Sequence, residues 1–214
     1  MQPFYLVKAL SGAAVSGIAT SQTVSSAGTI TLNGSTVVGG AAVLDTQRRV
    51  VISSQGNDSG TNFTVYGTRQ GGNVISETVA GTSAGAAVTT QDFATVTAIS
   101  TTNSTANTVF VGENTTGSTP WWLVNWHATS PINIGIGVVT SGTVVYSIEY
   151  TYDDVTGTYP NPSFTFPQTF ILSLLSALSA KADSNMVTPV GAIRLTVLSG
   201  TGSATATIIQ SSIG

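Results

Sequence analysis

Short segments in which apolar and polar residues alternate recur along the chain. In residues 62–68, Phe63 and Val65 alternate with polar neighbours. A period of two places successive side chains on opposite faces of a β-strand, so this segment is expected to be a half-buried strand. Apolar or β-branched runs between turn residues predict further strands over residues 29–32, 41–44, 48–53, 74–79, 93–99, 108–111, 132–139, 144–152, 192–198 and 204–210.

Turn-forming residues separate these segments. Asn33-Gly34, Gly39-Gly40 and residues 70–73 are examples. Strands that recur every 8–12 residues or so with such turns are typical of a β-sandwich or barrel. We therefore expect an all-β chain, folded as an antiparallel β-sandwich or a jelly-roll-like structure.

Two local features refine this expectation. The last two segments, 192–198 and 204–210, are joined by the turn 199–203 and are expected to pair as a hairpin. Only residues 169–181 could form a helix, because Phe170, Leu174, Leu175 and Leu178 would share one face. At most one short helix is therefore expected.

A change in composition along the sequence predicts two β sub-domains. A polar, turn-rich run at residues 112–120 separates a first sub-domain, residues 29–112, from a second, residues 121–214. Residues 1–28 contain many small residues with little periodicity. This segment is either a first strand or an N-terminal arm that packs on a neighbouring subunit.

The composition limits the classes of function. Of the 214 residues, 7% are charged, against about 25% in ordinary globular domains, and cysteine is absent. Disulfides and thiolate metal sites are thereby excluded, and six basic residues at a net charge of −3 do not make a nucleic-acid-binding face. No apolar run is long enough for a transmembrane helix, and the N-terminus does not resemble a cleaved signal peptide. Neither nucleic acid nor a membrane is expected as a partner.

Candidate catalytic and metal-binding residues are few. His127 is the single histidine, and no nucleophile motif accompanies it. Asp153-Asp154 and Asp58 lie in turn-rich segments without a calcium-loop spacing, so a solvated loop and an Asx-type turn are the preferred interpretations. We expect no enzyme activity, cofactor or metal.

Aromatic residues form the most informative local pattern. Three tryptophans follow the polar run, and Tyr146, Tyr150 and Tyr152 share one face of a predicted strand. Such a cluster could be sandwich core, a subunit interface, or a surface that stacks glycans. The interface candidates of this cluster are Trp121, Trp122, Trp126, Tyr146, Tyr150 and Tyr152.

Arg48 and Arg49 form the only basic pair and are also interface candidates. On a strand their side chains point to opposite faces, so they do not form one patch. One of them is expected to pair with Asp45 or with an acid on another subunit.

The scarcity of charge has a consequence for the surface. Soluble proteins protect strand edges and surfaces with charged residues, and a charge-poor surface favours association. We therefore expect much of this surface to be buried in an assembly, with copies of the chain itself or with other subunits.

One block resembles structural proteins of tailed bacteriophages. It comprises residues 44–68, LDTQRRVVISSQGNDSGTNFTVYGT, followed by GNVISETVAG at 72–81, and the chain end at 189–203 is similar to theirs. The resemblance covers most of residues 18–112 and the last 30 or so residues.

This resemblance implies a virion protein assembled in the host cytoplasm. The leading expectation is a head decoration (cement) protein that binds the major capsid protein lattice. The alternative is a neck or tail component, such as an adaptor, nozzle or fibre subunit. A glycan- or receptor-binding module is the third expectation.

Overall fold

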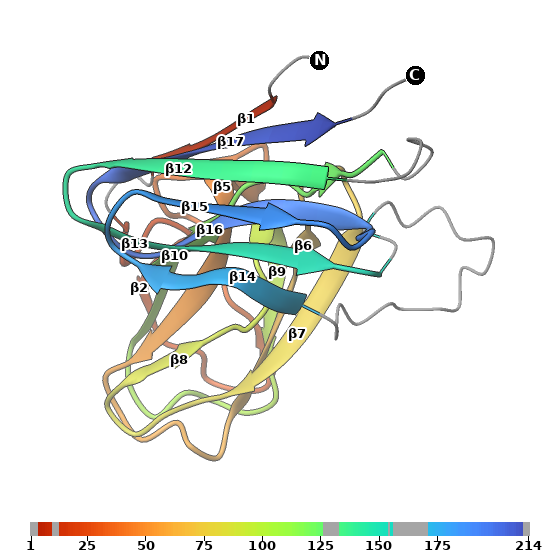
Figure 1. The fold of residues 1–214 in the computed structure, drawn as a ribbon. Coiled ribbons are helices and arrows are strands. Elements are labelled where there is room, and N and C mark those ends of the chain that lie inside the picture. Colours follow the sequence, from red (N-terminus) through yellow and green to blue (C-terminus); the bar gives the residue numbers. More distant parts are fainter. Residues whose placement is uncertain (1–3, 10–12, 126–132, 154, 156–170, 212–214) are drawn as a thin grey trace. The chain divides into compact units, whose positions relative to one another are not determined.

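Figure 1 shows the fold in a computed structural model, which describes residues 4–9, 13–125, 133–153, 155 and 171–211. In this part of the chain every regular element is a β-strand, and the strands pair antiparallel. The predicted all-β antiparallel fold is thereby confirmed. No helix of the described residues is long and apolar enough to cross a membrane.

The chain divides into two compact units. Unit 2 comprises residues 11–117, and unit 1 comprises residues 118–214 together with residues 1–10. The division falls within the polar run at 112–120. Residues 1–28 do not stay together, because the strand of residues 4–9 belongs to unit 1 and that of residues 19–22 to unit 2.

Unit 2 is built on one long sheet with short added strands. Its strand order is β10-β5-β9-β6-β7, and β2 pairs with β10, β3 with β9, and β4 and β8 with β5. The inward residues, among them Phe63, Val65, Phe93 and Ile99, form its core. The strands are β2 (Ala19–Gln22), β3 (Gly28–Thr29), β4 (Val37–Val38), β5 (Ala41–Ser54), β6 (Asn62–Thr68), β7 (Val74–Ala80), β8 (Ala86–Val88), β9 (Phe93–Thr101) and β10 (Val109–Ser118).

Unit 1 is a two-layered β-sandwich. One sheet has the order β1-β17-β12-β15, and the facing strands are β14-β13-β16, with β11 paired to β16. Alternate residues of both layers meet in one core, for example Ile136 and Ile208 with Tyr146 and Leu195. The strands are β1 (Phe4–Ala9), β11 (Trp122–Leu123), β12 (Asn133–Ser141), β13 (Val144–Thr151), β14 (Ile171–Leu178), β15 (Ala182–Met186), β16 (Ala192–Gly200) and β17 (Ser203–Ser211).

The predicted hairpin of the last two segments is wrong. β17 pairs with β1 and β12, whereas β16 pairs with β13 in the other layer. The connection at 201–202 is therefore a corner between layers, and the β12–β13 connection beside it is a second corner. The backbone N–H of Gly202 donates to the Thr143 carbonyl over 2.8 Å, which ties the two corners together. The two strands join different layers because this arrangement buries the apolar faces of both layers, although the local turn pattern suits a hairpin.

The possible helix at 169–181 is not formed in the described residues of this segment, in agreement with the expectation of at most one short helix. Residues 171–178 form β14, which pairs with β13 through an irregular register. Leu174, Leu175 and Leu178 still pack against the sandwich core. The edge of β13 offers backbone hydrogen bonds, so tertiary pairing overrides a modest helix preference. Thr169 and Phe170 lie outside the described residues.

Candidate interaction surfaces

The outward side of β6, β7 and β9 in unit 2 forms a face without charged side chains. Alternate residues of these strands, such as Phe63, Val65 and Ile99, lie in the core, and the residues between them face outward. We name this surface the hydroxyl face. It consists of Asn62, Thr64, Tyr66, Thr68, Val74, Ser76, Thr78, Ala80, Thr95, Thr97, Ala98 and Ser100.

Hydrogen bonds between threonine hydroxyls connect neighbouring strands across this face. The Oγ1 atoms of Thr64 and Thr78 lie 2.8 Å apart, and those of Thr68 and Thr95 lie 2.7 Å apart. Between these pairs Tyr66 is 41% exposed, and Val74 at the end of β7 is 82% exposed. Covering this face therefore requires no desolvation of a charged group.

The outermost strand of this sheet, β7, is partly covered by the turn that precedes β9. Glu77 of β7 accepts hydrogen bonds from the backbone N–H groups of Thr90 and Gln91, each over 2.8 Å. The Gln91 side chain in turn donates to the Ser76 carbonyl over 3.0 Å. Because this turn lies on β7, the open face rather than the strand edge is the surface available to a partner.

Arg48 lies inside unit 2. From Val43 to Arg48, β5 advances five residues while its partner β9 moves two, from Thr95 to Phe93, so β5 bulges. Asp45 in this bulge accepts from Arg48 through both carboxylate oxygens, over 2.6 and 2.8 Å.

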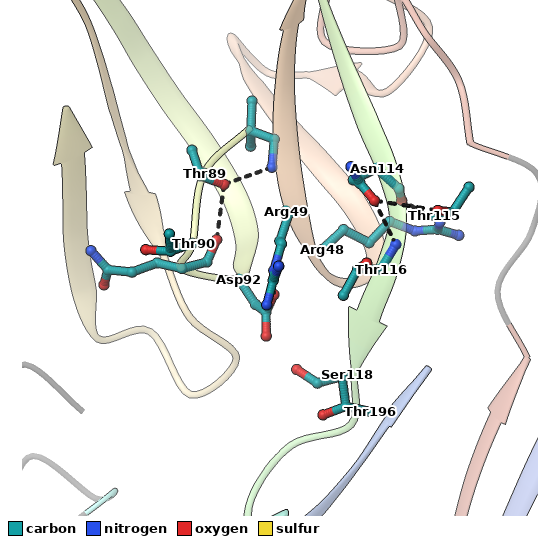
Figure 2. Close-up of polar contacts among 12 residues, drawn as sticks. Arg48, Arg49, Thr89, Thr90, Asp92, Asn114, Thr115, Thr116, Ser118 and Thr196 are labelled. Carbon is teal, nitrogen blue, oxygen red and sulfur yellow. Dashed lines mark hydrogen bonds and ion pairs between the residues drawn. The ribbon is translucent and has the colours of Figure 1, made fainter. Parts of the chain in front are cut away.

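Figure 2 shows Arg48 reaching toward Asn114 of β10, whose carbonyl accepts from the Arg48 guanidinium over 3.1 Å. The predicted pairing of one arginine with Asp45 is thus present. Arg48 is 0% exposed, which corrects its assignment as an interface residue. A buried guanidinium satisfied in this way holds the bulge against β10.

Glu113 of β10 is the second carboxylate near Arg48. Its Oε2 lies 3.8 Å from the Arg48 Nε, and its side chain is buried. Burial raises the pKa of Glu113 above its ordinary value, the Arg48 charge opposes this rise, and the Asp45 charge adds to it. Protonation of Glu113 is therefore linked to the stability of this cluster.

Arg49 stands apart from Arg48, as predicted from strand geometry. Its side chain is 40% exposed, and its Nε lies 3.7 Å from the buried Oδ1 of Asp92. Figure 2 shows the side chains of Arg49 and Asp92 next to each other. Arg49 remains accessible to a partner, as Arg48 does not.

The tryptophans of unit 1 contact the protein itself. The guanidinium of Arg194 lies 4.5 Å from the ring centre of Trp121, and its Nε donates to Glu149 over 2.7 Å. Trp122 in β11 is partly buried against the sandwich core. Trp126 and His127 lie outside the described residues. Trp121 and Trp122 therefore support the sandwich of unit 1.

The three tyrosines do not form one exposed face. Tyr146 is 0% exposed, and its hydroxyl donates to the Ala180 carbonyl over 2.8 Å. This burial corrects its assignment as an interface residue and agrees with the core alternative. Tyr150 is partly buried, and Tyr152, beyond the end of β13, is 51% exposed, with their rings edge to face at 5.9 Å.

Asp58 differs from its predicted role. The Asx-type turn is made by the neighbouring Asn57, whose Oδ1 accepts from the Ser59 backbone N–H over 3.3 Å. Asp58 is instead 1% exposed, and its Oδ1 accepts from the distant Ala106 N–H over 2.6 Å. Among the described residues no group of three or more His, Cys, Asp or Glu side chains is arranged to hold a metal.

Sequence reasoning did not identify the hydroxyl face. The low charge predicts a surface that is buried in an assembly but does not assign it to particular strands. The alternating Thr and Ser of residues 62–68 and 74–80 are the signal that locates it.

Comparison of the chain with protein-family models, with curated proteins and with solved structures finds no match.

Proposed function

We propose that this chain is a structural subunit of a tailed-bacteriophage virion, acting as a head decoration protein on the major capsid protein lattice. The observation that carries the proposal is the hydroxyl face, which exposes Tyr66 and Val74 and has no charged side chain. Tyrosine and apolar residues surrounded by neutral polar groups suit the centre of a protein interface, where charged residues are depleted.

The distribution of charge supports a structural role. Arg48 and Arg194 are buried and bonded to Asp45 and Glu149, respectively. These charges hold strands of the same unit together and leave the hydroxyl face neutral. The mechanism is then mass action: a subunit that binds only the assembled shell stabilises it by an amount that grows with its free concentration.

The copy number per virion tests this proposal. In purified particles, calibrated mass spectrometry should find about one copy, or about one-third of a copy, per major capsid subunit, as a lattice site requires. A total of about 6 to 12 copies would instead fit a ring in the neck or tail. That result would reject the decoration role and leave the neck or tail alternative. Absence from the particles would reject both.

A further inference from the structure

The carboxylate of Asp58 is buried without a counter-charge. The residue is 1% exposed, and its Oδ1 accepts a single backbone hydrogen bond, from Ala106. Its Oδ2 is buried and has no hydrogen-bond partner. None of the ion pairs of the described residues includes Asp58.

Two further oxygen atoms without partners belong to the adjoining loops. The Oγ of Ser54, at the end of β5, and the Oγ1 of Thr82 are both buried and lack a hydrogen-bond partner. Ser54 itself is 6% exposed. All three unpartnered atoms are oxygens, the ligand type that hard cations prefer.

Backbone hydrogen bonds bring these residues together. The Asp58 N–H donates to the Thr82 carbonyl over 2.9 Å, and the Ser54 N–H donates to the Gly85 carbonyl over 2.8 Å. The Ala84 N–H donates to the Gly56 carbonyl over 2.7 Å. Loop 54–60 and loop 81–86 are thus held against each other, with Asp58 and Thr82 adjacent.

A glycine keeps space beside the Thr82 hydroxyl. A Cβ atom on Gly85 would stand 3.3 Å from Thr82 Oγ1, so a side chain here would crowd that oxygen. The arginines of unit 2 are engaged elsewhere, Arg48 with Asp45, Arg49 near Asp92 and Arg69 with Gln91. No basic side chain of the described residues pairs with the buried charge.

From this buried carboxylate without a counter-charge and the unpartnered hydroxyl oxygens on the segments paired with it, we infer that loops 54–60 and 81–86 form a binding site for one hard metal cation, with Asp58 Oδ2 and Thr82 Oγ1 as its ligands. Burying a carboxylate without a counter-charge is unfavourable, and a bound cation offsets this cost. One carboxylate balances a monovalent ion such as Na⁺ in full. The inference does not depend on the proposed function.

The test compares thermal unfolding of the full chain in different chlorides. Wild type is unfolded in NaCl, KCl and CaCl₂, each against choline chloride at the same ionic strength and pH. The wild-type midpoint is expected to rise in at least one metal chloride relative to choline, because a ligand of the folded state stabilises it. Asp58→Asn keeps an oxygen for the Ala106 N–H and should lose the rise.

Two further variants complete the test. Asp183→Asn removes the same charge from an exposed position in β15 and should keep the wild-type response. Thr82→Val replaces the hydroxyl with a methyl group of similar size and should weaken the response, which provides a readout if Asp58→Asn does not fold. Equal responses of wild type, Asp58→Asn and Thr82→Val to every salt would overturn the inference.

Discussion

At the scale of residues, two buried arginines hold neighbouring parts of the fold together. Arg48 closes the β5 bulge through Asp45, and Arg194 joins β16 to β13 through Glu149. The Arg48 guanidinium is 0% exposed, so removing Asp45 would leave a buried charge with fewer hydrogen-bond partners and lower the free energy of unfolding. Although only 7% of the residues are charged, these pairs lie inside the fold and fix the positions of strands.

The first prediction concerns Glu113. Because burial raises the pKa of Glu113, the folded state holds this proton more tightly than the unfolded state. The resulting stabilisation is complete below the ordinary pKa of 4.5 and is lost as the pH rises through the folded value. Glu113→Gln carries no titrating proton. Its free energy of unfolding relative to wild type should therefore increase from about pH 4 to about pH 7.

Urea unfolding at a series of pH values and constant ionic strength measures this difference. A difference between Glu113→Gln and wild type that is independent of pH would contradict the linkage to Glu113. The difference in the free energy of unfolding at neutral pH then reports the balance between the burial of Glu113 and its attraction to Arg48.

At the scale of elements, the two corners of unit 1 decide its topology. The chain crosses between the layers at Gly142 and again at residues 201–202, and both crossings lie at the same end of the sandwich. Gly142 has φ +72° and Gly200 has φ +104°, conformations that favour glycine. A Cβ on Gly142 would approach the Gly202 Cα to 3.2 Å. The corners thus depend on close backbone contact.

The second prediction compares two glycines of this unit. A Cβ on Gly202 would lie 2.4 Å from the Ser141 carbonyl oxygen, whereas one on Gly137 in β12 would meet nothing within 4 Å. Gly202→Ala should lower the free energy of unfolding by about 3 kcal/mol through overpacking. Gly137→Ala should leave it unchanged or raise it by about 0.5 kcal/mol, since alanine loses less entropy in a strand.

The midpoints of urea unfolding, at an unchanged slope, provide the comparison. Equal stability of the two variants would show that the corners tolerate a side chain and are not closely packed.

At the scale of the whole molecule, unit 2 carries one face without charged side chains. The hydroxyl face lies on three neighbouring strands of unit 2, with Tyr66 near its middle and threonine pairs on either side. Burying a lysine ammonium in an interface costs several kcal/mol unless a partner charge compensates it. A single lysine on this face is therefore a sharp probe of assembly.

The third prediction uses Ser76, an exposed residue of β7 within the hydroxyl face. Ser76→Lys should fold as wild type does, because Ser76 is exposed and substitutions at exposed surface positions change stability little. Its binding to particles depleted of the protein should fall by about tenfold or more, since 1.4 kcal/mol corresponds to a factor of ten. Val187→Lys, at a position 66% exposed in unit 1, is the matched control and should bind normally.

Co-sedimentation with depleted particles measures both variants. Normal binding of Ser76→Lys together with loss for Val187→Lys would place the interface on unit 1 and remove the role of the hydroxyl face.

Much of the strand pattern followed from the sequence alone. Residues 62–68 alternate in polarity because one side of β6 is buried, and the structure has β6 with these bounds. The sequence also predicts the turn at Gly39-Gly40. In the structure both glycines lie between β4 and β5 and have positive φ. The opposite orientation of Arg48 and Arg49 followed from strand geometry. The low charge by itself predicts a surface that favours assembly.

Only the tertiary structure decided which segments pair and which side chains are buried. The alternation of β16 and β17 suits a hairpin as well as two layers, and the choice depends on partners far away, β13 for one and β12 and β1 for the other. Residues 171–178 became a strand because β13 lay open to them. Arg48 and Tyr146 entered the interior through contacts with Asn114 and Ala180. The local pattern of apolar and polar residues determines whether a segment suits a strand. Which side chains are buried depends on contacts with residues far away in the sequence.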